Sequence, residues 1–407
     1  MSATATFEYK VRDRQGQIKT GNLEAETQAQ VVGKLTSMGY APLSITQANV
    51  GMKRELTLPS FGKAVKLKEL ALFARQFATM ISSGLSLLRS LSILVEQTEN
   101  KKFSVILSDV RNDIETGNSL SAAMAKHDDV FPPLMVNMIR AGEVGGFLEA
   151  AMLQIAENYE AEVKLKGKIK AAMTYPTVVF IMAIIGVVGM LLFIVPVFAK
   201  LFKSFNAQLP APTRFLVFLS GAMTYLVPLF IVGGVALALA WPRLKKQQRV
   251  REIIDPIKLK IPVFGLLMRK IALSRFSRNL GTMMKSGVPI LQSLEIVSAT
   301  TGNLVLERAI KDVQESVRQG ESLAKPLEQH SVFPPMVVQM MSVGEDTGAL
   351  DQMLYKISEF YDQEVEATTE ALTALIEPLM IAFLGVIIGG MIVALYMPIF
   401  SLMNVIK

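Results

Sequence analysis

The chain has 407 residues, of which 51% are hydrophobic, and its mean hydropathy of +0.39 is high for a soluble protein. It carries a net charge of +7 and contains no cysteine, which excludes disulfides, thiolate metal sites and thiol catalysis. The basic residues cluster beside long apolar segments, where anionic lipid headgroups account for them. We therefore expect no nucleic-acid partner.

Residues 1–48 are predicted to form a small α+β module. The stretch FEYKVRD alternates like a strand, DRQGQ supplies turn residues, and KTGNLEAE continues as a second strand of a hairpin. AETQAQVVGKLTSMGY has helical spacing and stops at Gly39, and APLSI follows as a short strand. Residues 49–66 contain Gly51, Pro59 and Gly62 and are predicted to be a linker.

Residues 67–171 are predicted to form a cytoplasmic bundle of about six helices. The same pattern returns at residues 270–373. FPPLMVNMIRAGEVGG at 131–146 is matched by FPPMVVQMMSVGEDTG at 333–348, and further matches place the two copies 202 or 203 residues apart. The chain is therefore predicted to contain a duplicated helical domain, with each copy leading into its own membrane span.

Three segments without charged residues are each long enough to cross a bilayer as a helix, which takes about 20 apolar residues. We predict transmembrane helices at 172–199, 215–241 and 374–401, separated by a short extracytoplasmic loop at 200–214 and a cytoplasmic connector at 242–269. Lys and Arg crowd the residues just before the first span and just after the second. This places the N-terminus in the cytoplasm and the tail, 402–407, outside. The polar N-terminus predicts no cleavable signal peptide.

The repeated Gly-Glu turns are the most informative short motif. They consist of Gly142, Glu143, Gly146, Gly344, Glu345 and Gly348. We expect the last glycine of each turn to adopt a conformation that a side chain disfavours, and each glutamate to cap the incoming helix. An exposed partner contact is the alternative, and Glu143 is a weak candidate for a metal ligand.

A second candidate site lies in the spans, where prolines recur at equivalent positions of the two copies. Its members are Tyr175, Pro176, Pro196, Glu377, Pro378 and Pro398. The prolines are expected to kink or end their helices, which could create a groove for another hydrophobic helix, although simple helix termination explains them equally well. Glu377 is an ionisable residue at a span entrance, where it is either functional or in reach of water.

No constellation for catalysis is present in the sequence. It contains neither a phosphate-binding loop nor a nucleophile elbow. His127 and His330 occupy equivalent positions and are interpreted as structural, and Arg75, Arg111, Arg278 and Arg318 as solvated helix surface. We expect neither enzymatic activity nor a cofactor.

The chain as a whole resembles the inner-membrane platform proteins of type IV filament machines, the PilC/GspF family. The resemblance rests on three features: the N-terminal module with FEYKVRDRQGQIKTGNLEAE and GYAPLSI, the two F-x-R-x-F/L…SG…L domains with FPP and GE-x-x-G, and the three spans. The resemblance implies a mainly α membrane protein with two cytoplasmic six-helix bundles, three transmembrane helices and a small α+β N-terminal module. A divalent-ion site of some secretion members would carry over only to Glu143, and Phe147 stands where an acidic companion would be expected.

The function implied is that of a multi-pass platform of type IV pilus assembly in the inner membrane, with a type II secretion platform as the alternative. Its partners would be a hexameric cytoplasmic ATPase, pilin or pseudopilin subunits and other inner-membrane alignment proteins, and it would form a homo-oligomer such as a dimer. The rival classes are a transporter built on a repeat, a membrane hydrolase and a receptor. A transporter would place its repeats within many spans, and a receptor would need a larger outer domain.

Overall fold

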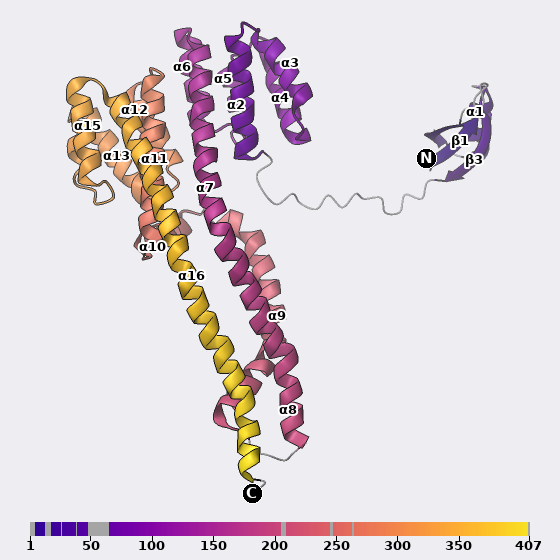
Figure 1. Ribbon diagram of the computed structural model, residues 1–407. Coiled ribbons are helices and arrows are strands. Elements are labelled where there is room, and N and C mark those ends of the chain that lie inside the picture. The colour runs from indigo at the N-terminus through magenta and orange to yellow at the C-terminus, as the bar shows by residue number, and fades with distance from the viewer. Residues whose placement is uncertain are drawn as a thin grey trace. The chain divides into compact units, whose positions relative to one another are not determined.

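The computed structural model describes residues 5–12, 18–25, 27–37, 39–47, 65–204, 209–244, 247–262 and 264–405. It divides the chain into two compact units, Met1–Phe61 and Gly62–Lys407, which we describe separately (Figure 1). The expected hairpin turn at 13–17 and most of the expected linker, 49–64, lie outside the described residues.

The N-terminal unit is a three-stranded antiparallel sheet with one helix. Its elements are β1 (Ala5–Arg12), β2 (Ile18–Ala25), α1 (Gln28–Ser37) and β3 (Ala41–Gln47), and the strand order is β2-β1-β3. Val11 and Ala25 of the strands pack against Val31 and Leu35 of the helix. These four apolar side chains form the core of the unit.

The first repeat is a bundle whose helices begin at capping residues. They are α2 (Leu67–Ser82), α3 (Leu87–Gln97), α4 (Lys101–Glu115), α5 (Leu120–Ala125), α6 (Pro133–Gly145) and α7 (Leu148–Gly189). Ser86, Asn100 and Ser119 accept backbone amide hydrogens at the starts of α3, α4 and α5. Aromatic side chains, Phe73 and Phe131 among them, fill the core.

The second repeat follows the same plan, with one extra helix before it. Its helices are α10 (Gln248–Lys260), α11 (Phe264–Lys285), α12 (Ile290–Thr300), α13 (Leu304–Arg318), α14 (Ala324–Leu327), α15 (Pro335–Thr347) and α16 (Leu350–Val405). Phe276 and Phe333 contact each other at 5.3 Å between ring centroids, as the equivalent Phe73 and Phe131 do at 6.0 Å. One continuous core joins the two repeats.

Three of the described helical stretches are long and apolar enough to cross a membrane, and they confirm the three expected spans. The first is α7, continued by a π-helical turn (Met190–Ile194) and α8 (Val195–Ser204); the second is α9 (Ala211–Leu244); the third is the far part of α16. Figure 1 shows α7 and α16 running from the two repeats into this region. Leu191, Leu216 and Leu395 join the three spans near the ends that are remote from the bundles.

Candidate functional site

The Gly-Glu turns hold each bundle together through their glutamates. Glu143 accepts hydrogen bonds from the backbone amides of Leu120 at 2.6 Å and Ser121 at 3.1 Å, at the start of α5. Glu345 accepts in the same way from Leu323, with 2.9 Å to each oxygen, and from Ala324 at 3.3 Å. Both carboxylates therefore cap a helix N-terminus, where amides lack helical partners and negative charge is stabilised.

The capped helix is not the one predicted from the sequence. We expected each glutamate to cap the incoming helix, α7 or α16, because that helix starts a few residues later. Instead, the carboxylates reach back 22 or 23 residues along the chain to the short helix that precedes α6 or α15. Since both oxygens of Glu143 are engaged with backbone amides, the geometry gives no support to its role as a metal ligand.

The glycines of these turns have two different physical roles. Gly146 and Gly348 end α6 and α15 with φ values of 75° and 71°, in the left-handed region that glycine favours. Gly142 instead allows two helices to approach closely, because an added Cβ would lie 2.8 Å from the Cβ of Ala151. Gly344 meets the backbone of α16 in the same way.

An equivalent ion pair ties the first long helix of each bundle to the helix that enters the membrane. Arg75 Nε donates to Glu160 at 2.7 Å, and this hydrogen bond raises the pKa of Arg75. In the second repeat, Arg278 donates to Asp362, which also accepts from Ser274 at 2.6 Å. The expectation that Arg278 is solvated is wrong, since the residue is only 8% exposed.

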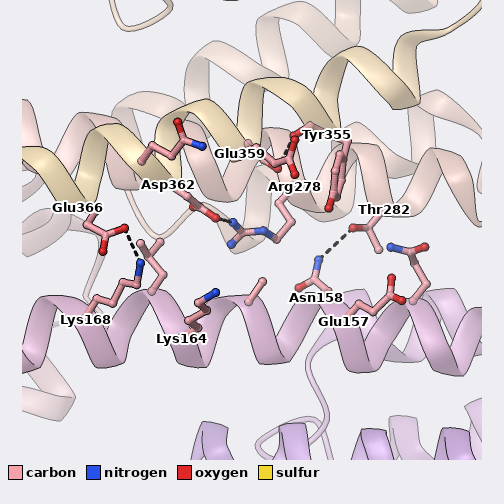
Figure 2. A pocket seen from close by; sticks show the side chains of 15 residues that line it. Glu157, Asn158, Lys164, Lys168, Arg278, Thr282, Tyr355, Glu359, Asp362 and Glu366 are labelled. Carbon is pink, nitrogen blue, oxygen red and sulfur yellow. Dashed lines mark hydrogen bonds and ion pairs between the residues drawn. The ribbon is translucent and has the colours of Figure 1, made fainter.

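A polar seam joins the two repeats at the end of the spans that is nearest the bundles. The buried Asn158 of α7 donates to Thr282 at 3.1 Å and to Asn279 at 3.3 Å, both on α11. The adjoining cavity has a volume of about 500 Å³. Figure 2 shows the charged side chains of α7, α11 and α16 among those that line it. Lys168 pairs across it with Glu366. The two repeats thus meet through hydrogen bonds and ion pairs just before the chain becomes apolar.

The four span prolines do not end their helices, contrary to one of our expectations. Pro176 lies inside α7, Pro196 is the second residue of α8, and Pro378 and Pro398 lie inside α16. Each proline lacks the amide hydrogen that would bond a carbonyl of the preceding turn, four residues earlier in an α-helix and five in a π-helix. In hydrocarbon such a carbonyl needs another donor.

Hydroxyl side chains of a neighbouring span supply that donor near the end of the spans that is remote from the bundles. Thr213 Oγ1 of α9 donates to the carbonyl of Ala394, which Pro398 leaves without its helical partner. Thr213 is 1% exposed and Ala394 is 5% exposed, so neither water nor another side chain can easily take the place of the hydroxyl. The second span thereby satisfies a break that the third span creates.

In the first span, a hydroxyl of α9 also bonds a carbonyl left free by the equivalent proline, Pro196. In the π-helical turn, the amide of Val195 bonds the carbonyl of Met190. The next bond in that register would join Pro196 to Leu191, and proline cannot make it. Ser220 Oγ of α9 donates to the Leu191 carbonyl at 2.6 Å instead. A buried hydroxyl of α9 therefore serves each of the two repeats.

The two prolines at the bundle ends of the spans, Pro176 and Pro378, differ in whether a side chain bonds the carbonyl that each leaves free. The carbonyl of Ala172, freed by Pro176, accepts from Thr373 Oγ1 of α16 at 3.4 Å. For the carbonyl that Pro378 frees, no side-chain donor is recorded among the described residues. Sequence reasoning missed these hydroxyls; the signal available to it was the presence of Thr213 and Ser220 among the few polar residues of α9.

An apolar groove does lie between α7 and α16, but it lies between the predicted prolines of each span and not at them. Its volume is about 250 Å³, and its lining is entirely apolar: Phe180, Ala183, Ile184, Val187, Val188, Met380, Phe383, Leu384 and Ile387. None of the six predicted positions in the spans is among these residues. Tyr175 and Glu377 are exposed on their helices, and the structure does not bring them together with the groove.

No group of three or more potential acidic or histidine ligands for a metal occurs in the part of the chain that the structure describes. His330 Nε2 lies 3.5 Å from Asp312, between two helices of the second bundle. This contact fits the structural interpretation of His330.

Two homologous bundles, each continuous with its own membrane helix, define a membrane protein built from a duplicated bundle-and-span unit. The profile of the type II secretion system protein F family matches the chain twice, over residues 73–196 and 276–398, and the profile of its N-terminal domain matches residues 4–46. The chain belongs to this family. Both the predicted duplication and the predicted family are thereby confirmed.

Similar proteins include members of two kinds of machine. The type IV pilus assembly protein PilC of Myxococcus xanthus is 42% identical, covering 100% of this chain and 97% of the relative. PilC of Thermus thermophilus is 41% identical, covering 98% of each chain. The type II secretion system protein F of Vibrio cholerae is 30% identical, covering 98% of this chain and 99% of the relative.

Proposed function

We propose that this chain is the inner-membrane platform protein of a type IV pilus assembly machine. The observation that carries the proposal is that α7 and α16 each run unbroken from a bundle core into a span. It is supported by full-length similarity, at 42% and 41% identity, to proteins named for type IV pilus assembly. The N-terminus and both bundles would lie in the cytoplasm, and the C-terminus outside.

The geometry suits a non-enzymatic transducer. A hexameric assembly ATPase would bind the bundles, and α16, with 56 residues at about 1.5 Å each, would reach about 84 Å from its bundle through the membrane. Ion pairs such as Arg278–Asp362 fix that helix to its bundle. A displacement of the bundle would therefore move the span as well.

The apolar groove between α7 and α16 would receive the hydrophobic helix of a pilin, or of a pseudopilin in a secretion system. Its lining has no polar atom that would need a partner, and Ala183 leaves room for a close approach. Other inner-membrane alignment proteins and a second copy of the chain complete the proposed set of partners. No cofactor is part of the proposal.

A platform of a type II secretion system is the second candidate, since a protein F at 30% identity also covers nearly the whole chain. A transporter is a remote third. Deletion and complementation separate them. We expect the deletion strain to lose its surface pili while pilin stays in the membrane, and we expect the reintroduced gene to restore the pili. Loss of an exported protein with normal pili would transfer the assignment to secretion. Unchanged pili and unchanged export would overturn both.

A further inference from the structure

The helix α10, in the segment expected to be a connector, has an exposed apolar face. It begins at Gln248, soon after α9 ends at Leu244. Ile253 is 64% exposed and Ile257 is 53% exposed, and Ile261, just past the helix end, is 43% exposed. Because residues four apart share one side of a helix, these isoleucines form a single stripe.

The opposite face of α10 is fixed to the second repeat. The buried Asp255 accepts the backbone amide of Leu304 at 3.1 Å, at the start of α13, and Arg251 donates to Glu307 at 2.8 Å. The turn into α11 is tight, since a Cβ added to Gly265 would lie 2.2 Å from the carbonyl oxygen of Leu259. The isoleucine stripe therefore cannot roll inward without breaking these contacts.

The helix α10 leads into α11 at the level where α7 and α16 lose their charged residues. Leu267 and Ile271, early in α11, pack with Ile169 of α7 and Leu372 of α16. Ile169 and Leu372 lie within a few residues of the points where α7 and α16 lose their charges. Figure 1 shows α10 at the end of the second repeat that faces the spans. Phe264, the first residue of α11, is also an exposed apolar residue.

Cations border the stripe at both ends. Arg249 lies one turn before Ile253 and Lys260 lies one turn after Ile257, and both are exposed. Within the described residues, the other cations of α10, Arg251 and Lys258, form ion pairs, whereas none is recorded for these two. The one exposed acidic residue of α10, Glu252, pairs with Arg308.

We propose that α10 is an interfacial helix, with its isoleucine stripe inserted into the cytoplasmic leaflet and Arg249 and Lys260 on anionic lipid headgroups. An apolar stripe flanked by cations is the pattern of helices that lie in a bilayer surface. Only three residues separate the span α9 from α10, so the start of α10 stays close to the end of that span. The proposal rests on the membrane orientation given with the proposed function, and it is independent of which machine the chain serves.

The absence of cysteine makes a direct test possible in the full-length protein. Single cysteines replacing Ile253 or Ile257 carry the fluorophore NBD, and the purified protein is reconstituted in vesicles of phosphatidylethanolamine and phosphatidylglycerol with brominated acyl chains. Val105→Cys on α4, at a valine that is 60% exposed, is the matched control. Leu229→Cys on the span α9, 65% exposed, reports full lipid contact.

We expect bromolipid quenching at positions 253 and 257 to approach that at 229 and to exceed that at 105 several-fold. Quenching no greater than at 105 would overturn the proposal, and so would a blue-shifted emission without quenching, which would indicate burial against protein. Omitting phosphatidylglycerol is expected to reduce quenching in the labelled protein that keeps Arg249 and Lys260, but not in the same labelled protein with Arg249→Gln and Lys260→Gln. If quenching in the protein that keeps both cations does not change, the role of the headgroups is refuted.

Discussion

Replacing Thr213 by valine removes a hydroxyl while keeping the shape of the side chain. In the structure that hydroxyl donates to the carbonyl of Ala394, whose helical donor is missing because residue 398 is proline. Both ends of the bond are at most 5% exposed. The carbonyl would therefore be left without a partner in an apolar environment, and we expect Thr213→Val to destabilise the packing of α9 against α16.

The magnitude follows from measured hydrogen bonds in membranes. Interhelical bonds in bilayers contribute about 0.6 kcal/mol on average and up to about 2 kcal/mol. Here the bond is buried and the acceptor has lost its intrahelical donor, so we expect a loss in the upper part of that range, about 1–2 kcal/mol. Thr224 of α9, whose hydroxyl bonds its own helix at Ser220, provides the control; Thr224→Val is expected to cost less than about 0.5 kcal/mol.

A double-mutant cycle isolates the cause. Pro398→Ala returns an amide hydrogen to α16, which can then bond the carbonyl of Ala394 within the helix. In that background Thr213→Val is expected to cost about 0.5 kcal/mol or less, giving a coupling of about 1 kcal/mol. The free energy of unfolding is measured by denaturation in mixed micelles or by steric trapping in bicelles. An equal cost of Thr213→Val in both backgrounds would refute the reasoning.

Three further predictions concern the stability of the full-length protein, measured as the midpoint of thermal or denaturant unfolding. Gly142→Ala is expected to cost about 1–3 kcal/mol by overpacking, whereas Gly167→Ala, where an added Cβ meets nothing within 4 Å, is expected to gain up to about 1 kcal/mol; equal effects would contradict the packing role. Asp362→Ala strands a buried arginine and is expected to cost about 3–5 kcal/mol, while the equivalent but half-exposed Glu160→Ala is expected to cost about 1 kcal/mol or less; a reversed order would refute this. Burial would raise the pKa of Glu307, but neighbouring cations hold it below its ordinary value, so its contribution is present at neutral pH and is lost as pH falls below about 4.3. The stability gap between the parent and Glu307→Gln is expected to narrow on acidification, and a widening gap would be evidence against this sign.

The repeats and the spans could be predicted because they rest on long, regular patterns. A long charge-free segment identifies a membrane span, and a motif such as FPP that occurs twice identifies a repeated domain, whichever residues pack around them. The partner of Glu143 could not be predicted in this way. Its nearest helix start in sequence is α7, but the fold brings the start of α5, 23 residues earlier, within 2.6 Å of the carboxylate. Which of several amides meets a given side chain is decided by tertiary packing.

The prolines show the same limit. Proline predicts a broken backbone bond, but whether the helix then ends depends on a donor from elsewhere. Here Ser220 and Thr213 of α9 supply donors, and the helices continue. Likewise, arginine is usually a surface residue, but Arg278 is buried where it contacts Asp362. The isoleucine stripe of α10 is visible in the sequence, but its exposure is known only once Asp255 is seen to hold the other face.

The central claim is that the bundles receive an ATPase while the spans guide a pilin. Single cysteines at Val144 and Asp346, exposed at equivalent places beside the Gly-Glu turns, and at Ile184 and Phe383, in the apolar groove, would carry a photo-activated crosslinker in living cells. Val232, exposed on α9 away from the groove, is the control. We predict that the first pair captures a hexameric ATPase subunit and the second pair captures pilin, with neither captured at 232. Pili that assemble normally while none of these positions captures either partner would contradict the claim.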